Sequence, residues 1–240
     1  MKRISSEQRK WLVVAVYAVA MAWVEAAVVY YLRTMVNRIE PYQPNPLPIA
    51  TGLGEAELVR EAATLIMLLA VGWLAGSTAR ARAGYSLLAF GIWDIFYYVF
   101  LRTLTGRPTA LTDWDILFLI PLPWWGPVWA PVAIALLMIL WGTLVTQFEP
   151  VRSSPGPNWK HLGFVAFGVV LALYVFMADA IQVRDQGVSA LRNVLPLWFN
   201  WPLFVVALAL LALPVIDAAF RAARSRRRIA GDLTTTDESS

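Results

Sequence analysis

The feature that most limits the possible folds is a series of long stretches without charged side chains. The longest covers residues 116–148, between Asp115 and Glu149. A helix needs about 20 mainly apolar residues to cross the hydrocarbon core of a bilayer, which is about 30 Å thick. Because similar stretches recur along the chain, much of its apolar surface is expected to face lipid. The sequence therefore predicts a polytopic membrane protein whose first partner is the lipid bilayer.

The composition excludes several other classes of protein. Hydrophobic residues make up 59% of the chain and charged residues 15%, whereas soluble domains have about 45–50% and about 25%. This excludes a soluble enzyme and a nucleic-acid-binding domain, so no nucleic acid partner is expected. The absence of cysteine excludes disulfides, thiolate metal sites and cysteine nucleophiles. A single histidine, His161, excludes sites that need two imidazoles from this chain, and no cofactor is expected.

Six transmembrane helices are predicted, which gives an all-α membrane helix bundle. The predicted spans are residues 11–32, 58–79, 84–102, 127–148, 161–183 and 198–220. Residues 1–10 form an N-terminal segment before this domain of residues 11–220. Residues 221–240 form a basic and polar tail that is predicted to be disordered.

The distribution of Lys and Arg predicts the orientation of the bundle. Of the 20 basic residues, most lie at the two termini and in the connections that follow the second and fourth spans. Since cytoplasmic loops are enriched in Lys and Arg, we expect both termini in the cytoplasm and the protein in the cell membrane. The first span could instead be a signal peptide cleaved near residues 18–20. Its apolar stretch continues to Tyr31, which favours a retained helix.

Small residues at regular spacing predict how the helices pack. Ala18, Ala22 and Ala26 share one face of the first span, and Gly72 and Gly76 share one face of the second. Helices in lipid associate through such small residues because their backbones can approach closely. We expect these faces to pack within the bundle, although they could also bind a membrane-protein partner or a second copy.

Four acidic residues interrupt the predicted spans and are expected to point away from lipid. They are Glu25, Glu61, Asp94 and Asp179. Glu25 lies about 20° around its helix from Ala18, on the packing face. A charge at the bilayer centre costs about 2.5–3.5 kcal/mol, and such residues usually face a cavity or a partner. Two interpretations stay open. The acids are structural, either buried as protonated carboxyls or, for Glu25 and Asp94, paired with arginines near the same end (Arg33, Arg60, Arg102 or Arg184), or they form an outward-facing acidic pocket.

Aromatic residues near the predicted outer boundary extend the candidate pocket. They either anchor the protein at lipid headgroups or line a site for a flat or cationic ligand. The candidate ligand-binding residues are Glu25, Glu61, Asp94, Tyr97, Tyr98, Trp124 and Trp125. A metal held by carboxylate oxygens of Glu25 and Asp94 also stays open.

The least regular stretch of the sequence is rich in proline and tryptophan and covers residues 111–131. Its prolines, Pro121, Pro123, Pro127 and Pro131, cannot share one undisturbed helix, because each removes a backbone donor and crowds the preceding turn. The sequence therefore predicts an interfacial or re-entrant segment near 113–122, a bend, and then the fourth helix. The alternative is a loop that its tryptophans anchor on the outer surface.

Three functions are compatible with these features. The first is a solute-binding or transport component with an outward acidic and aromatic pocket. The second is an accessory or assembly subunit whose acids form structural ion pairs. The third is a lipid-modifying enzyme, which is least favoured because the phosphate-loop, GxSxG and HExxH motifs are all missing.

In architecture the chain is similar to the six-helix substrate-binding components of energy-coupled vitamin importers. The similarity rests on the number of helices and on the small residues Ala18, Ala22 and Ala26 of the first span, and it includes no diagnostic motif. It implies an outward pocket with a capping loop. The loop at residues 40–57 is the segment that could cover the acidic region.

Overall fold

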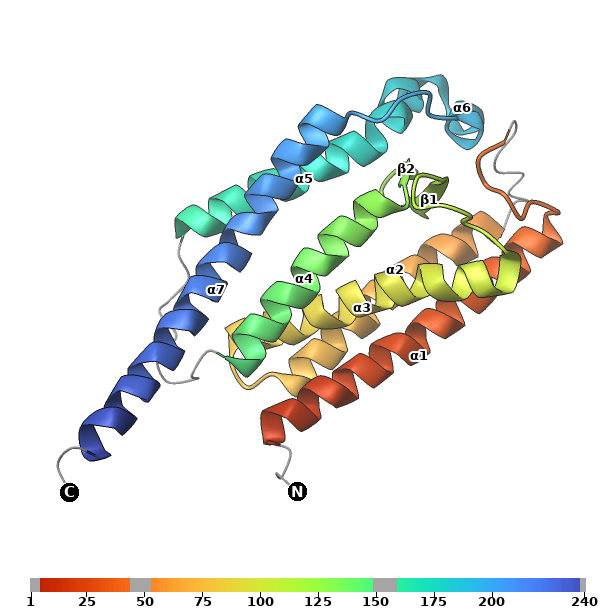
Figure 1. Ribbon diagram of the computed structural model, residues 1–240. Helices are drawn as coiled ribbons and strands as arrows, with labels where there is room; N and C mark the ends of the chain where they lie inside the picture. The colour runs from red at the N-terminus through yellow and green to blue at the C-terminus, as the bar shows by residue number, and fades with distance from the viewer. Residues whose placement is uncertain (1–4, 44–52, 149–158, 238–240) are drawn as a thin grey trace.

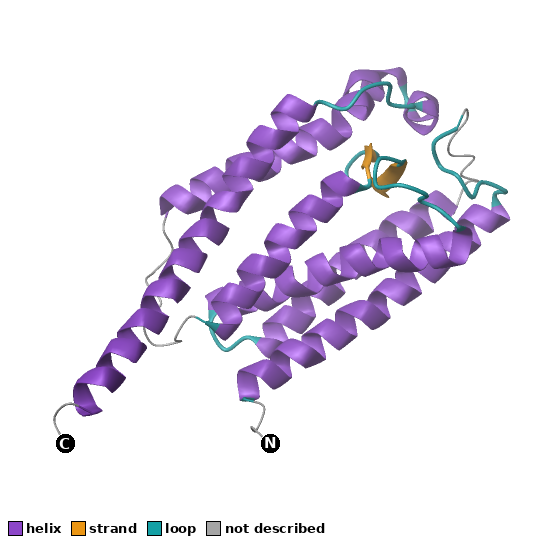
Figure 2. Ribbon diagram, viewed as in Figure 1, coloured by secondary structure: helices purple, strands orange, loops and turns teal. Residues whose placement is uncertain are grey.

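The computed structural model describes residues 5–43, 53–148 and 159–237 (Figures 1 and 2). Residues 44–52, in the predicted capping loop, lie outside the described residues. The elements are α1 (Ser6–Met35), α2 (Leu53–Ala75), α3 (Ala79–Thr105), β1 (Trp114–Phe118), β2 (Trp124–Pro127), α4 (Trp129–Gln147), α5 (Trp159–Val183), η1 (Arg184–Gln186), α6 (Val188–Asn193) and α7 (Trp201–Asp237). Six of these helices are long and apolar enough to cross a membrane, which confirms the predicted number and is consistent with a multi-pass membrane protein.

The boundary between α2 and α3 differs from the prediction. The second span was expected to continue to residue 79, but α2 ends at Ala75. The early start of the next helix has a local cause. Thr78 adopts an extended conformation, and its hydroxyl accepts a hydrogen bond from the Ala81 N–H. A threonine in this position satisfies one of the free donors at a helix start. α3 therefore begins at Ala79, five residues before the predicted start.

The last helix is longer than predicted. α7 continues through Arg221 to Asp237, so helix extends over most of the segment for which a disordered tail was predicted. Alanine and arginine are frequent from residue 218 to residue 230, and both residue types favour helix. The composition that suggested a solvated tail is therefore also compatible with helix.

The bundle is organised around α3, which packs against α1, α2 and α4. α5 and α7 form a second pair, and α7 joins the first group by packing against α4. The start of α1 and the end of α7 lie at the same end of the bundle, which we call the terminal end (Figure 1). The two strands and α6 lie at the opposite end, which we call the hairpin end.

The small residues are used inside this chain. Ala18, Ala22 and Ala26 are fully buried in the core that includes α3. A Cβ placed on Gly91 would lie 2.5 Å from the Ala135 carbonyl oxygen of α4. These residues therefore permit close approach between helices of one chain, and an interface with a protein partner or a second copy remains a prediction.

The segment before α4 is a β-hairpin, an element that the sequence analysis did not predict. β1 and β2 are antiparallel, with Asp115 opposite Gly126 and Ile116 opposite Trp125. Pro121 and Pro123 lie in the connection between the strands, where no ladder hydrogen bond is lost. Pro131 lies in the first turn of α4, where its missing N–H costs no helical hydrogen bond. The position of this hairpin relative to the membrane remains a prediction.

Candidate functional site

A cavity of about 150 Å³ lies at the hairpin end of the bundle, and we call it the acidic cavity. Residues of α1 and the segment after it, of α2, α3 and β1, and the residue that follows β1 line it. Five of the seven candidate residues are among its lining: Glu25, Glu61, Asp94, Tyr97 and Tyr98. The helical spacing that placed these side chains away from lipid also brings them to one volume.

Glu25 takes part in an ion pair, as one of the two interpretations expected. The Arg60 guanidinium of α2 donates hydrogen bonds to Glu25 of α1 and to Glu57 of its own helix. The Thr64 hydroxyl donates to the second oxygen of Glu25 at 3.2 Å. One arginine therefore compensates two carboxylates and links α1 to α2.

Glu61 is held by the backbone that follows β1. It is 5% exposed, and its two oxygens lie 3.1 and 2.9 Å from the Leu119 nitrogen, which donates to them. This contact fastens α2 to the hairpin. It could not be read from the sequence, because it depends on a backbone donor that the hairpin presents.

Asp94 differs from the other acids of the cavity. It is 8% exposed, and its Oδ2 is buried without a hydrogen-bond partner in the described part of the chain. No arginine or lysine of the described residues forms an ion pair with it either. A buried polar group without a partner is costly, and more so when it is charged. The structural interpretation thus accounts for Glu25 by an ion pair and would require Asp94 to be buried as a protonated carboxyl.

Aromatic rings form the wall beside Asp94. Trp93 and Tyr97 of α3 are stacked with their ring centroids 6.2 Å apart, and Tyr98 meets Tyr97 edge-on at 5.0 Å. Phe118 of β1 lies 6.1 Å from Trp93. Because residues one, three and four positions away from Asp94 are aromatic, α3 alone supplies both the carboxylate and most of the aromatic surface.

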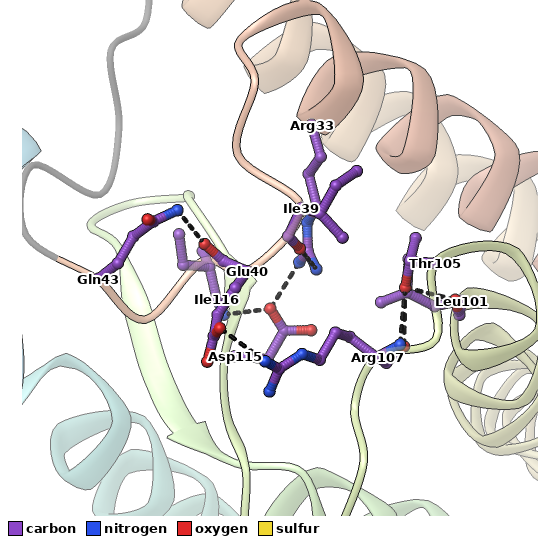
Figure 3. A network of polar contacts seen from close by, with 9 residues as sticks. All are labelled: Arg33, Ile39, Glu40, Gln43, Leu101, Thr105, Arg107, Asp115 and Ile116. Atoms are coloured by element: carbon purple, nitrogen blue, oxygen red, sulfur yellow. Dashed lines mark hydrogen bonds and ion pairs between the residues drawn. The ribbon is translucent and has the colours of Figure 1, made fainter.

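A second, polar cavity of about 200 Å³ adjoins the first, and Arg33 and Pro41 line both. Arg33 Nη2 donates to Asp115 Oδ1 at 2.6 Å, and the Ile116 N–H donates to the same oxygen at 2.9 Å (Figure 3). Asp115 is 3% exposed. From the sequence, Arg33 was expected only as a partner for Glu25 or Asp94. Its actual partner comes from the hairpin, which was not predicted.

More exposed polar contacts also line the polar cavity. Arg107 donates to Glu40 at 2.8 Å, and both side chains are partly exposed (Figure 3). Asp113 accepts hydrogen bonds from the Thr109 N–H and hydroxyl and from the Ala110 N–H. Partial burial acts to raise the pKa of Asp113, but these hydrogen bonds outweigh it and lower that pKa.

Two of the candidate residues do not line the acidic cavity. Trp125 is 2% exposed and packs edge-on against Tyr42, while Trp124 stacks parallel to Phe176 of α5 at 6.2 Å. Both rings therefore contribute to the packing of β2. The acid Asp179, which was also expected near the outer end, is half-buried on α5 and outside the acidic cavity.

The donor set of the described residues does not favour a metal ion. No group of three or more His, Cys, Asp or Glu side chains within residues 5–43, 53–148 and 159–237 is arranged to hold one. Ca²⁺ and Mg²⁺ require about six or more oxygen ligands, several of them from the protein or a bound substrate. The cavity is better suited to a ligand that needs one carboxylate and apolar contacts.

Comparison with known proteins gives no match: no protein-family model, no curated protein and no solved structure is significantly similar to the chain. The function must therefore be argued from the cavity itself.

Proposed function

We propose that the protein is a solute-binding or transport component of the cell membrane that takes a small molecule into the acidic cavity. The observation that carries the proposal is the convergence of Glu25, Glu61, Asp94, Tyr97 and Tyr98 on one volume. These residues come from three helices, and ligand pockets between the helices of a bundle are typically lined in this way, with apolar and aromatic surface and a few polar groups.

The alternative that all the acids are structural accounts for only part of the cavity. Arg60 compensates Glu25 and Glu57, and the Leu119 N–H serves Glu61. Asp94 has neither kind of partner in the described residues. Acids within membrane spans that line a cavity and have no partner in the protein typically mark the path or the site of a substrate.

Two further functions receive less support. An assembly subunit would use its small-residue faces for partners, but Ala18, Ala22 and Ala26 are buried within this chain. A lipid-modifying enzyme would need a nucleophile or base beside the acids. Among the described residues that line the acidic cavity there is no serine, cysteine, histidine or lysine.

The orientation is part of the proposal. With both termini in the cytoplasm, the acidic cavity opens toward the outer side, since it lies at the end of the bundle away from the termini. The excess of Lys and Arg in the segments at the terminal end supports this orientation. A solute would then reach the cavity from outside the cell.

Binding can be tested with three molecules of nearly equal shape and different charge. They are choline, its uncharged analogue 3,3-dimethyl-1-butanol and the anion 3,3-dimethylbutanoate, all of a size suited to a cavity on the order of 150 Å³. We expect at least one of them to raise the thermal unfolding temperature of the purified protein in detergent. Isothermal titration should give a dissociation constant for the same compound.

A matched pair of variants places the binding in the acidic cavity. Val29 of α1 lines the cavity, while Val24 of the same helix is 61% exposed on the outer surface of the bundle. Val29→Phe should weaken binding at least tenfold because the larger ring fills the cavity, and Val24→Phe should leave it unchanged. The proposal fails if none of the three compounds binds, or if both variants bind as well as the wild-type protein.

A further inference from the structure

The acidic cavity has more acidic than basic side chains. Four carboxylates and three guanidiniums line it, and one of these guanidiniums, that of Arg33, is bound to a further carboxylate, Asp115. Arg60 is shared by Glu25 and Glu57. The carboxylates of the cavity and its wall therefore outnumber the positive charges, and a positively charged ligand would restore the balance.

Asp94 is distinguished from the other acids of the cavity by its lack of a partner in the described residues. Glu61 accepts hydrogen bonds from the Leu119 N–H, whereas the buried Oδ2 of Asp94 accepts none from the described residues. More than nine-tenths of Asp94 is buried and the residue lines the cavity, so a ligand in the cavity would lie beside it and away from bulk water. A charge placed beside it would interact strongly, because little water is present to screen the interaction.

The surroundings of Asp94 match an organic cation better than a metal ion. Trp93, Tyr97 and Tyr98 flank it on α3, and the faces of such rings attract ammonium groups. A metal ion would find too few oxygen ligands, since no three His, Cys, Asp or Glu side chains of the described residues are placed to hold one together. An ammonium needs only one carboxylate and gains from the aromatic contacts.

We infer that the acidic cavity binds a small organic cation, an ammonium compound whose charge faces Asp94 and whose carbon atoms contact Trp93, Tyr97 and Tyr98. This inference rests on the proposed function and specifies the class of solute. Asp94 is the charge-recognising residue, and the paired acids Glu25 and Glu57 maintain the shape of the cavity through Arg60.

The same three compounds test the charge of the ligand in the wild-type protein. Choline should bind at least tenfold more tightly than 3,3-dimethyl-1-butanol, and 3,3-dimethylbutanoate should bind most weakly, because the three differ mainly in charge. If the neutral or the anionic compound binds as tightly as choline or more tightly, the cation inference is overturned while the proposed function stands. If none binds, both fail.

Substitution of Asp94 tests its role. Asp94→Asn keeps the shape of the side chain and removes the charge, so it should lower the affinity for choline at least tenfold and leave the affinity for the neutral compound unchanged. The variant is expected to fold, since the acid that it replaces has no partner in the described part of the chain. Asp179→Asn, on α5 and outside the cavity, is the matched control and should bind choline as the wild-type protein does. Retention of the preference for choline in Asp94→Asn would overturn the role of Asp94.

Discussion

At the scale of single residues, the cavity region contains two contrasting acids. Asp115 is buried and paired with Arg33 at 2.6 Å, while Asp94 is buried without a partner in the described residues. Breaking a buried ion pair is strongly destabilising, since it leaves an uncompensated charge. The two acids therefore differ in what their substitution should reveal: Asp115 reports on folding and Asp94 on binding.

We expect Arg33→Met to lower the free energy of unfolding by about 3–5 kcal/mol, because Asp115 is then buried without its cation. The double variant Arg33→Met/Asp115→Asn should recover more than half of this loss, since no lone charge remains. Equilibrium unfolding in detergent mixed with increasing amounts of a denaturing detergent measures both values.

The control for this pair is Arg9→Met, at an exposed position near the start of α1. Its effect should stay within about 0.5 kcal/mol, as for most surface substitutions. A double variant that is less stable than Arg33→Met alone would show that the ion pair does not account for the loss.

At the scale of secondary structure elements, the contact between α3 and α4 depends on glycine. A Cβ on Gly91 would lie 2.5 Å from the Ala135 oxygen and 2.8 Å from Ile139 Cγ1. A Cβ on Gly142 of α4 would lie 2.5 Å from the Gly84 oxygen. Backbone atoms cannot rotate away as a side chain can, so the two helices would have to separate.

Gly91→Ala should therefore lower the free energy of unfolding by about 1–3 kcal/mol, which is typical of overpacking in a core. Gly163→Ala is the matched control, because a Cβ there meets nothing within 4 Å. Alanine favours helix over glycine by about 0.8–1 kcal/mol, so the control should be neutral or slightly stabilising. Equal effects of the two substitutions in thermal unfolding would contradict close packing at Gly91.

The elements differ in how far the sequence could predict them. The helices were predictable because apolar length alone is decisive in a bilayer. The ends of the helices were harder to predict from the sequence, since the boundary at Thr78 depends on a capping hydrogen bond. The hairpin was not predicted, because its residues Trp114–Phe118 are too few to distinguish a short strand from a helix turn by periodicity.

The same limits apply to the candidate site. Helical spacing was sufficient to bring Glu25, Glu61 and Asp94 toward one volume. It could not show that Arg60 serves Glu25, because three other arginines near the same end were equally available in the sequence. Trp124 was chosen for its boundary position, and the hairpin directs it toward α5 instead.

At the scale of the whole molecule, apolar side chains cover the outside of the helices, and the acids of the cavity lie between the helices. Large hydrophobic side chains are exposed along the outside of the helices, such as Leu74 of α2 and Phe167 of α5. In water this would expose an extensive apolar patch, but in a bilayer it is the surface expected to meet lipid. The acids of the cavity are kept from that surface by their position between α1, α2 and α3.

The orientation of the molecule can be determined with introduced cysteines, because the chain has none of its own. Ser6 at the start of α1 and Thr112 before β1 are both exposed, and they lie toward opposite ends of the bundle. If the basic terminal end faces the cytoplasm, a membrane-impermeant maleimide should label Thr112→Cys in intact cells. It should label Ser6→Cys only after the membrane is opened, while the cysteine-free protein stays unlabelled throughout. Labelling of Ser6→Cys and not of Thr112→Cys in intact cells would reverse the orientation and place the opening of the acidic cavity on the cytoplasmic side.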